Sequence, residues 1–258
     1  MTDALSGKTV LLTGASAGIG LATARAMLIA GASGVVVNGR NGERAEAAAE
    51  SLRAEFPDRT IGAAPCDIST PDGATQAVET ALSALGHVDV LFNSAGGNDL
   101  PKLFHKTPIE DIPAMTGPAC NAIVLPCRAV LPHMSERGSG AIINVASDAA
   151  KIATPGEAVI GGVMAFIVMF TRGLAIEARR NGIRANCITP SIVRETPLYD
   201  RLMADDFAGK LFAKAEQMAH LGVVEAQELA ELAVFLASPA AAKITGQAIS
   251  INGGISAA

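Results

Sequence analysis

A glycine-rich turn near the N-terminus is the segment whose residues most directly suggest a chemistry. An apolar run at residues 9–12 leads into Thr13-Gly14-Ala15-Ser16-Ala17-Gly18-Ile19-Gly20, and a helical pattern follows. Glycines permit a tight turn and close backbone approach, and the free N–H groups at a helix start attract phosphate oxygens. Because the turn joins a predicted strand to a predicted helix, we expect it to bind the pyrophosphate of a dinucleotide. The residues expected to contact the cofactor there are Gly14, Ser16, Gly18, Ile19 and Gly20.

The residues that follow the second apolar run indicate which dinucleotide the turn would hold. An acid at the end of that strand bonds the ribose 2′-hydroxyl of NAD(H), whereas a guanidinium suits the 2′-phosphate of NADP(H). The sequence there is Asn38-Gly39-Arg40-Asn41, with no acid. Arg40 therefore favours NADP(H). NAD(H) remains the alternative if Arg40 is only a solvated residue at the start of a helix.

The elements that must position these residues alternate along the chain. Short apolar runs, typical of strands covered on both faces, are separated by amphipathic helical patterns. This β-α alternation predicts an α/β fold, a Rossmann-type doubly wound parallel sheet, in a single domain that spans residues 1–258. The predicted strands are residues 9–12, 34–38, 60–66, 88–92, 141–145, 183–188 and 248–251.

Two regions depart from this regular pattern. A helical pattern at 108–133 contains Pro118, Pro126 and Pro132, and interior prolines remove a backbone hydrogen bond, so we expect a bent or broken helix. A charged segment at 191–221 precedes the last helix–strand unit. Because it follows the carboxyl end of a strand, we expect a lid over the substrate site.

Composition narrows the classes of partner. The net charge is −5 and only 3% of residues are aromatic, so neither nucleic acid nor an anionic membrane is an expected partner. The longest nearly uninterrupted apolar stretch, 158–170, is shorter than the ~18 residues of a membrane span. No signal peptide is recognised, and the four cysteines form no CxxC pair. We expect a cytoplasmic protein without a metal.

Several motifs together carry a family resemblance. The TGxxxGxG turn, Asn93-Ser94-Ala95-Gly96 and Asn252-Gly253-Gly254 occur in that order, with similarity along essentially the whole chain. In this respect the chain resembles the short-chain dehydrogenase/reductase family. The resemblance implies a small-molecule substrate and hydride transfer between a nicotinamide and a carbonyl or secondary alcohol. It also implies a homo- or hetero-oligomer, a dimer or tetramer, built on the helices at 108–134 and 157–179.

The same resemblance assigns further cofactor contacts. Two residues would flank the adenine, three would line the adenosine and ribose, and three would meet the nicotinamide carboxamide. Thr196 matches a family threonine only with one extra residue intervening. These positions, in chain order, are Asp67, Ile68, Asn93, Ala95, Gly96, Pro190, Ser191, Ile192 and Thr196.

The family's catalytic set is mostly missing. That set is a Ser that holds the substrate oxygen, a Tyr that moves its proton, a Lys that lowers the Tyr pKa, and an Asn that anchors a relay water. Ser147 occupies the Ser position. The Tyr and Lys positions hold Ile160 and Met164, and the Asn position holds Ala119. Neither Ile160 nor Met164 can transfer a proton.

Three hypotheses follow from this substitution. The first is an oxidoreductase with non-standard or weak activity, using a displaced proton donor or an unusually activated substrate. The second is a non-catalytic cofactor-binding subunit that partners an active family member. The third is a lyase, isomerase or hydrolase that reuses the cleft through Ser147 and Asp148. Candidate replacement donors are Tyr199, Asp148, Lys151, His105 and Lys106.

Overall fold

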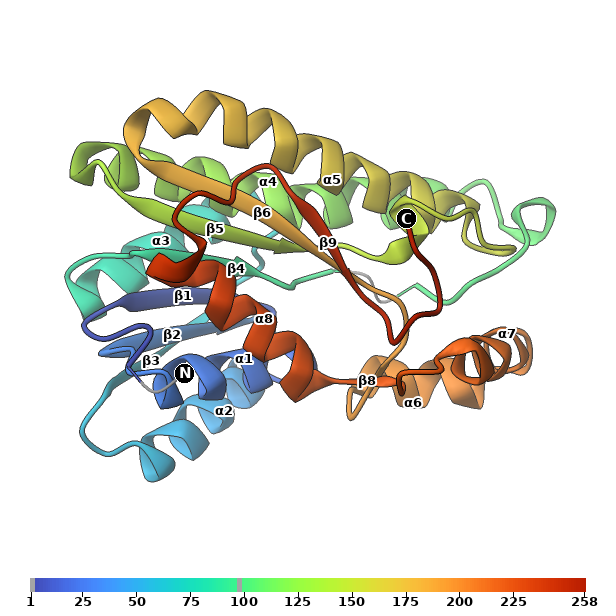
Figure 1. The fold of residues 1–258 in the computed structure, drawn as a ribbon, viewed down its shortest axis with the longest axis horizontal. Helices are drawn as coiled ribbons and strands as arrows, with labels where there is room; N and C mark the ends of the chain where they lie inside the picture. The colour runs from blue at the N-terminus through green and yellow to red at the C-terminus, as the bar shows by residue number, and fades with distance from the viewer. Residues whose placement is uncertain (1–2, 97–98) are drawn as a thin grey trace.

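Seven parallel strands form the central sheet of the computed structural model (Figure 1). The structure describes residues 3–96 and 99–258, so residues 1–2 and 97–98 of the predicted domain lie outside the described residues. The strand order is β3-β2-β1-β4-β5-β6-β9, which confirms the doubly wound Rossmann-type prediction. The strands are β1 (Thr9–Thr13), β2 (Gly34–Gly39), β3 (Thr60–Pro65), β4 (Val90–Asn93), β5 (Gly140–Val145), β6 (Ile183–Pro190) and β9 (Ala248–Ile251).

The strand order reverses between β1 and β4. From β1 the chain runs outward through β2 and β3, then returns to pair β4 on the other side of β1. In an open α/β sheet, ligands bind outside the carboxyl ends of the strands at such a switch point. The glycine-rich turn after β1 and the loop after β4 therefore meet at the expected ligand site.

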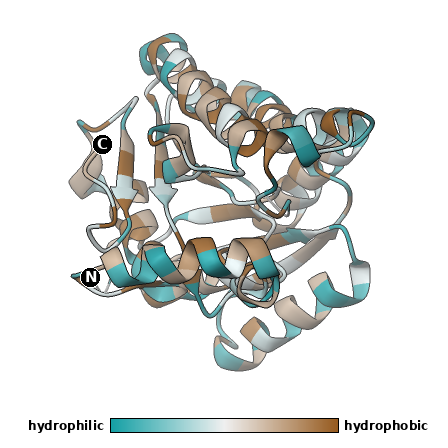
Figure 2. Cartoon of the chain, turned by 90° about the vertical axis from the view of Figure 1, so that its right-hand side faces the viewer, coloured by the Kyte–Doolittle hydropathy of each residue, from teal (hydrophilic) through white to brown (hydrophobic). Residues whose placement is uncertain are grey.

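Helices cover both faces of the sheet (Figure 1). One face packs against α1, α2 and α8, and the other packs against α3, α4 and α5. The strands are mostly apolar, brown in Figure 2, whereas the outer helices mix brown with teal. The helices are α1 (Gly18–Ile29), α2 (Gly42–Glu55), α3 (Pro71–Leu85), α4 (Ile112–Arg137), α5 (Ala158–Ala178), α6 (Pro197–Ala204), α7 (Asp206–Met218) and α8 (Ala226–Ala237).

Helix α4 is not broken, contrary to one of the alternatives expected from its prolines. It runs without interruption from Ile112 to Arg137 with Pro118, Pro126 and Pro132 inside it. Each proline removes one backbone donor, but the helix is held by apolar packing against α3, α5 and the sheet. Tertiary packing thus overrides the local preference.

The segment expected to be a lid is more regular than the sequence suggested. It contains α6, α7 and β7 (Val193–Arg194), and β7 pairs with β8 (Val224–Glu225) just after the segment. Ile192, Leu202, Ala208 and Phe212 form its own small apolar core. Pro197 at the start of α6 and the Asp205 cap of α7 are the sequence signals for these helices.

Helices α4 and α5 are long and apolar enough to cross a membrane by length and composition alone. The nearly uninterrupted apolar run at 158–170 is shorter than a membrane span, but the average hydropathy over an 18-residue window of each helix reaches the value of one. Both helices pack on each other and on the sheet. Only 28% of the apolar window of α4 and 39% of that of α5 is buried, so this packing accounts for part of their apolar surface.

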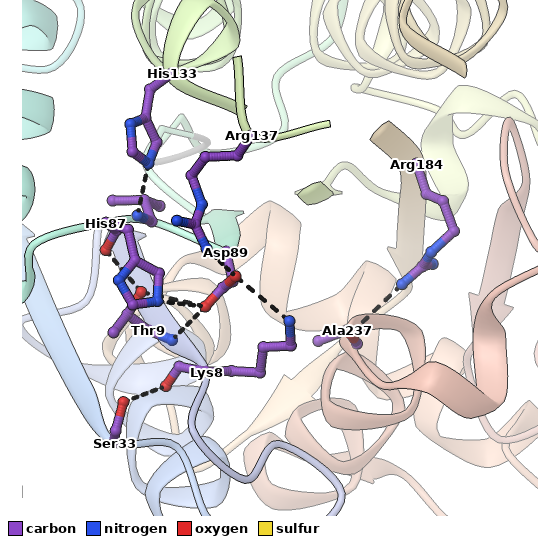
Figure 3. Close-up of polar contacts among 10 residues, drawn as sticks. Lys8, Thr9, Ser33, His87, Asp89, His133, Arg137, Arg184 and Ala237 are labelled. Carbon is purple, nitrogen blue, oxygen red and sulfur yellow. Dashed lines mark hydrogen bonds and ion pairs between the residues drawn. The ribbon is translucent and has the colours of Figure 1, made fainter. Parts of the chain in front are cut away.

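A cluster of polar and charged residues connects the N-terminal ends of the central strands β1 and β4 (Figure 3). The buried Asp89 carboxylate accepts the Thr9 N–H at 3.0 Å and lies 3.4 Å from Lys8 and 3.1 Å from His87. Burial by itself raises the pKa of Asp89. The Thr9 N–H and the charges of Lys8 and His87 outweigh burial and lower it. This cluster joins β1 to the start of β4 at the end of the sheet opposite the ligand site.

Candidate active site

The glycine-rich turn forms a cradle that side chains would fill. Gly14 has a φ of +64°, and a Cβ atom there would lie 2.7 Å from the Ala95 backbone. A Cβ atom at Gly20 would lie 2.5 Å from the Gly14 carbonyl oxygen. Helix α1 starts at Gly18, and the side chain of its N-cap, Ala17, makes no capping hydrogen bond. The first N–H groups of α1 therefore remain suited to the oxygens of a pyrophosphate.

Ser16, Arg40 and Asp67 converge where β1, β2 and β3 end. The Ser16 hydroxyl lies beside the last residue of β2, because a Cβ atom at Gly39 would be 2.9 Å from Ser16 Oγ. Asp67 accepts hydrogen bonds from the Ser69 hydroxyl at 2.7 Å and the Ser69 N–H at 3.0 Å. These bonds, and the nearby charge of Arg40, lower the pKa of Asp67 although partial burial raises it. A guanidinium beside a hydroxyl fits a ribose phosphate.

Asn93 belongs to a buried polar chain that sequence reasoning described only in part. It accepts from the Thr13 hydroxyl at 3.1 Å and donates to Asn144 Oδ1 at 2.9 Å. Asn144 in turn donates to the Thr171 hydroxyl at 2.9 Å. These hydrogen bonds link β1, β4, β5 and α5 through buried side chains. Polar residues within apolar stretches were the signal for Asn144 and Thr171.

The remaining predicted cofactor contacts lie at the carboxyl ends of strands or in the segments that follow them. Ala95 lies against Gly14, and Gly96 lies beside Ala119. The Ile68 side chain is buried in the apolar cluster that includes α3. Pro190 ends β6, and Ser191 and Ile192 follow it.

Two of these predicted contacts also have structural roles in segment 191–221, the expected lid. The Ile192 side chain packs among Leu202 and Phe212. Thr196 lies beside Gly18, but its hydroxyl donates to the Val193 carbonyl and caps α6 by accepting the Tyr199 N–H.

The positions expected to handle protons form one apolar cavity. Ile160, Met164 and Ala119 all line it, and the free volume inside is about 10 Å³, room for about one water molecule. Ser147, the remaining polar catalytic position, follows β5, and its Oγ accepts the Ala149 N–H at 3.2 Å. A larger cleft of about 290 Å³ adjoins the cavity and shares Asp99 and Met115 with it.

Two of the candidate replacement donors are committed to the C-terminal segment. Buried Asp148 accepts hydrogen bonds from Ser250 and Ser256, each at 2.8 Å, and from Asn252. Lys151 donates to the Ser250 hydroxyl at 2.8 Å and to the Ala248 carbonyl at 3.0 Å. Neither side chain lines the cavity at Ile160. These contacts argue against a proton-donor role and against the third hypothesis, which relies on Asp148.

The other candidate donors lie away from the cavity. The Tyr199 hydroxyl donates to Glu216 at 3.0 Å, and Arg194 binds the same carboxylate at 2.9 Å. His105 and Lys106 form an exposed 3₁₀ turn.

Two acidic residues were missed by the sequence reasoning. Asp99 lines both the apolar cavity and the larger cleft. Glu157 directly precedes α5, one turn before Ile160, and burial raises its pKa although a bond from Thr154 opposes the shift. Glu157 is not among the described residues that line either space. No sequence motif marks either acid. The folded chain places Asp99 at the cavity and Glu157 at the start of the helix that carries Ile160 and Met164.

Comparisons with known proteins agree with this geometry. The family model described as Enoyl-(Acyl carrier protein) reductase matches residues 14–256. Gluconate 5-dehydrogenase of Gluconobacter oxydans is 32% identical over 256 residues, covering 97% of this chain and 95% of that protein.

Solved structures with the same fold contain nicotinamide cofactors. A gluconate 5-dehydrogenase from Burkholderia cenocepacia in complex with NADP and tartrate superposes with a TM-score of 0.87 at 30% identity, covering 97% and 96% of the two chains. A 3-ketoacyl-(acyl-carrier-protein) reductase from Brucella melitensis complexed with NADH also has a TM-score of 0.87, at 31% identity, covering 98% and 100%.

Proposed function

Because the chain belongs to the short-chain dehydrogenase/reductase family, we propose that it binds NADP(H) and acts as an oxidoreductase of non-standard or weak activity. The substrate would be a small molecule with a carbonyl or secondary alcohol. The single observation that carries this proposal is the combination of an open glycine cradle with a cavity lined by Ile160 and Met164. NADP(H) is favoured over NAD(H) by Arg40, which lies near Asp67.

The chain's own described residues can orient a substrate but supply no positioned proton donor. When bound, the cofactor supplies or accepts the hydride. Ser147 can hold a substrate oxygen through its hydroxyl, but that hydroxyl has ordinary acidity. Reducing a carbonyl without a donor leaves an alkoxide in an apolar cavity, which is costly. A positioned acid or base is worth about 10²–10⁴ in rate, and we expect ordinary ketone reduction to be slower by that factor.

A second candidate is a non-catalytic subunit that partners an active family member. The cavity at Ile160 has room for about one water molecule, which favours a site that no longer admits a reacting group. The outer face of α5 exposes Phe166 (44%), Met169 (63%) and Ile176 (59%), and an apolar patch of this kind suits contact with another subunit. In either case we expect a cytoplasmic protein in a homo- or hetero-oligomer.

Titration with NADPH and NADH, followed by a carbonyl panel, tests the proposal. We expect NADPH to bind more tightly than NADH and to be oxidised slowly with at least one carbonyl. Absence of binding by either nucleotide at millimolar concentration would contradict the cofactor assignment. Binding without turnover would favour the non-catalytic subunit, and a stable homo-oligomer with robust activity would exclude that subunit.

A further inference from the structure

The apolar cavity has one ionisable lining residue. Five of its lining side chains are uncharged, and among the described residues the only charged one is Asp99. The family's Lys position holds Met164, which is neutral, and the one charged residue in the described lining is the exposed Asp99. The lining residues are Asp99, Met115, Ala119, Ile160, Val163 and Met164.

This charge pattern is unfavourable for carbonyl reduction. Negative charge develops on the carbonyl oxygen as hydride arrives, and enzymes stabilise it with donors or cations. Here the nearby charge is negative and the neighbouring side chains offer no proton. The same surroundings favour an electrophile that begins with a positive charge and loses it during the reaction.

Building on the proposed hydride transfer, we infer that the substrate is an iminium ion, a C=N⁺ electrophile derived from a cyclic or N-alkylated amine. The iminium carbon accepts a hydride from a reduced nicotinamide, and a C–H bond forms. The π electrons of the C=N bond become the nitrogen lone pair, so the product is a neutral tertiary amine. The nicotinamide is oxidised by two electrons. No proton is taken up, and the loss of the Tyr and Lys positions is therefore no obstacle.

The adjoining cleft offers a path for such a cation. It is lined by Asp99, Asp111 and Lys102 together with uncharged residues, so its lining carries one more negative than positive charge. Asp99 and Met115 belong to both spaces. Because the apolar cavity has room for only about one water molecule, the whole amine would lie in the cleft of about 290 Å³. Its C=N⁺ group would lie beside Asp99, which the cleft shares with the cavity.

A matched pair of electrophiles tests the inference kinetically. We would measure NADPH oxidation with 2-methyl-3,4-dihydroisoquinolinium and with 2-tetralone, a neutral ketone of similar size, and subtract the reaction in buffer. The iminium should be preferred in kcat/KM by at least about 100-fold, since only the ketone needs a positioned acid. The I160Y/M164K double variant should raise ketone turnover and lower iminium turnover.

Asp99→Asn tests the charge that recognises the cation. The attraction between two unit charges about 4 Å apart in water changes a rate or equilibrium constant by roughly sixfold. The variant should therefore lose about sixfold in kcat/KM for the iminium and little in kcat/KM for the ketone. High salt should also reduce the preference of the parent protein for the iminium over the ketone. Asp111→Asn is the matched control, because Asp111 lines only the larger cleft, and its effect should be smaller.

A binding measurement gives a readout independent of turnover. Calorimetry should show that N-methylisoquinolinium binds the NADP⁺-loaded protein more tightly than 2-naphthol, a neutral molecule of nearly the same shape. Asp99→Asn should remove most of this difference. Equal binding of the two compounds by the parent would overturn the inference.

The outcomes separate this inference from the function on which it rests. Iminium turnover above ketone turnover supports the inference. NADPH binding with iminium turnover no faster than in buffer, or with the ketone preferred, overturns the inference while leaving cofactor binding intact. Failure to bind NADPH overturns both. If Glu157→Gln abolishes ketone reduction, or removes the dependence of ketone reduction on pH, then Glu157 is a proton donor for this site and the inference is wrong.

Discussion

Asp148 accepts a hydrogen bond from Ser250 across 2.8 Å although the two residues are 102 positions apart. Asn252 and Ser256 donate to the same buried carboxylate. The loop that begins with Ser147 is therefore fastened to β9 and the C-terminal segment. A serine in a loop needs such fastening if its hydroxyl is to hold a substrate oxygen in a fixed place.

Asp148→Asn should lower the free energy of unfolding by about 1–3 kcal/mol, because an amide group would face donors that now share a carboxylate. Urea denaturation measures this change. Asp58→Asn, on the exposed surface, is the matched control and should shift the midpoint little. If both variants unfold at the same urea concentration as the parent, Asp148 does not fasten the loop.

Arg40→Ala should weaken NADPH binding while leaving NADH binding unchanged. A charge-assisted hydrogen bond is worth about 1.5–3 kcal/mol, so the Kd for NADPH should rise by at least about tenfold. Arg44→Ala removes an equally exposed arginine one turn along α2 and should leave both constants unchanged. An equal loss for NADPH and NADH would show that Arg40 does not read the 2′-phosphate.

Gly14→Ala should abolish dinucleotide binding and destabilise the fold. The new methyl group would lie 2.7 Å from the Ala95 backbone, at a φ of +64° that residues other than glycine adopt with strain. Gly173→Ala places a methyl group in open space on α5 and should stabilise the helix by about 0.5–1 kcal/mol. Thermal denaturation with and without NADPH distinguishes the two. Retained NADPH binding by Gly14→Ala would contradict the cradle.

Acid should weaken the fold through Asp89. Its pKa in the folded chain is lowered, chiefly by the Thr9 N–H against the opposing effect of burial. A lowered folded pKa stabilises the protein above the ordinary carboxyl pKa of about 3.9, and this stabilisation is lost as pH falls through the folded value. Asp89→Asn should therefore be less stable at pH 7 and lose less stability below about pH 4. Parallel pH profiles for parent and variant would refute this.

Sequence reasoning succeeded where local pattern determines the outcome. The apolar runs predict every strand of the main sheet to within two residues at each end. The strand order β3-β2-β1-β4-β5-β6-β9 comes from the structure alone. The glycine turn lies between β1 and α1, as its motif predicts, whereas the cofactor contacts of this turn and of Arg40 stay predictions. The assignment of Ile160 and Met164 to the family's Tyr and Lys positions stays an interpretation of the motif spacing; both residues lie on α5.

What the sequence could not provide depends on contacts between distant segments. Helix α4 stays continuous because packing compensates for its prolines. Asp148 was a candidate acid until Ser250 and Asn252, about a hundred residues later, were found bound to it. Asp99 has no motif at all, and only the folding of its loop over α4 and α5 brings it to the cavity.

The most direct test of the account is the Ile160→Tyr, Met164→Lys double substitution, with NADPH oxidation in the presence of a ketone as the measurement. If an intact cofactor cradle has lost only its proton-handling groups, ketone turnover should rise by about 10²–10⁴ over the parent while the Kd for NADPH stays nearly constant. Unchanged ketone turnover in a folded, NADPH-binding double variant would contradict that claim, because the cleft would then differ from an active one in more than these two side chains.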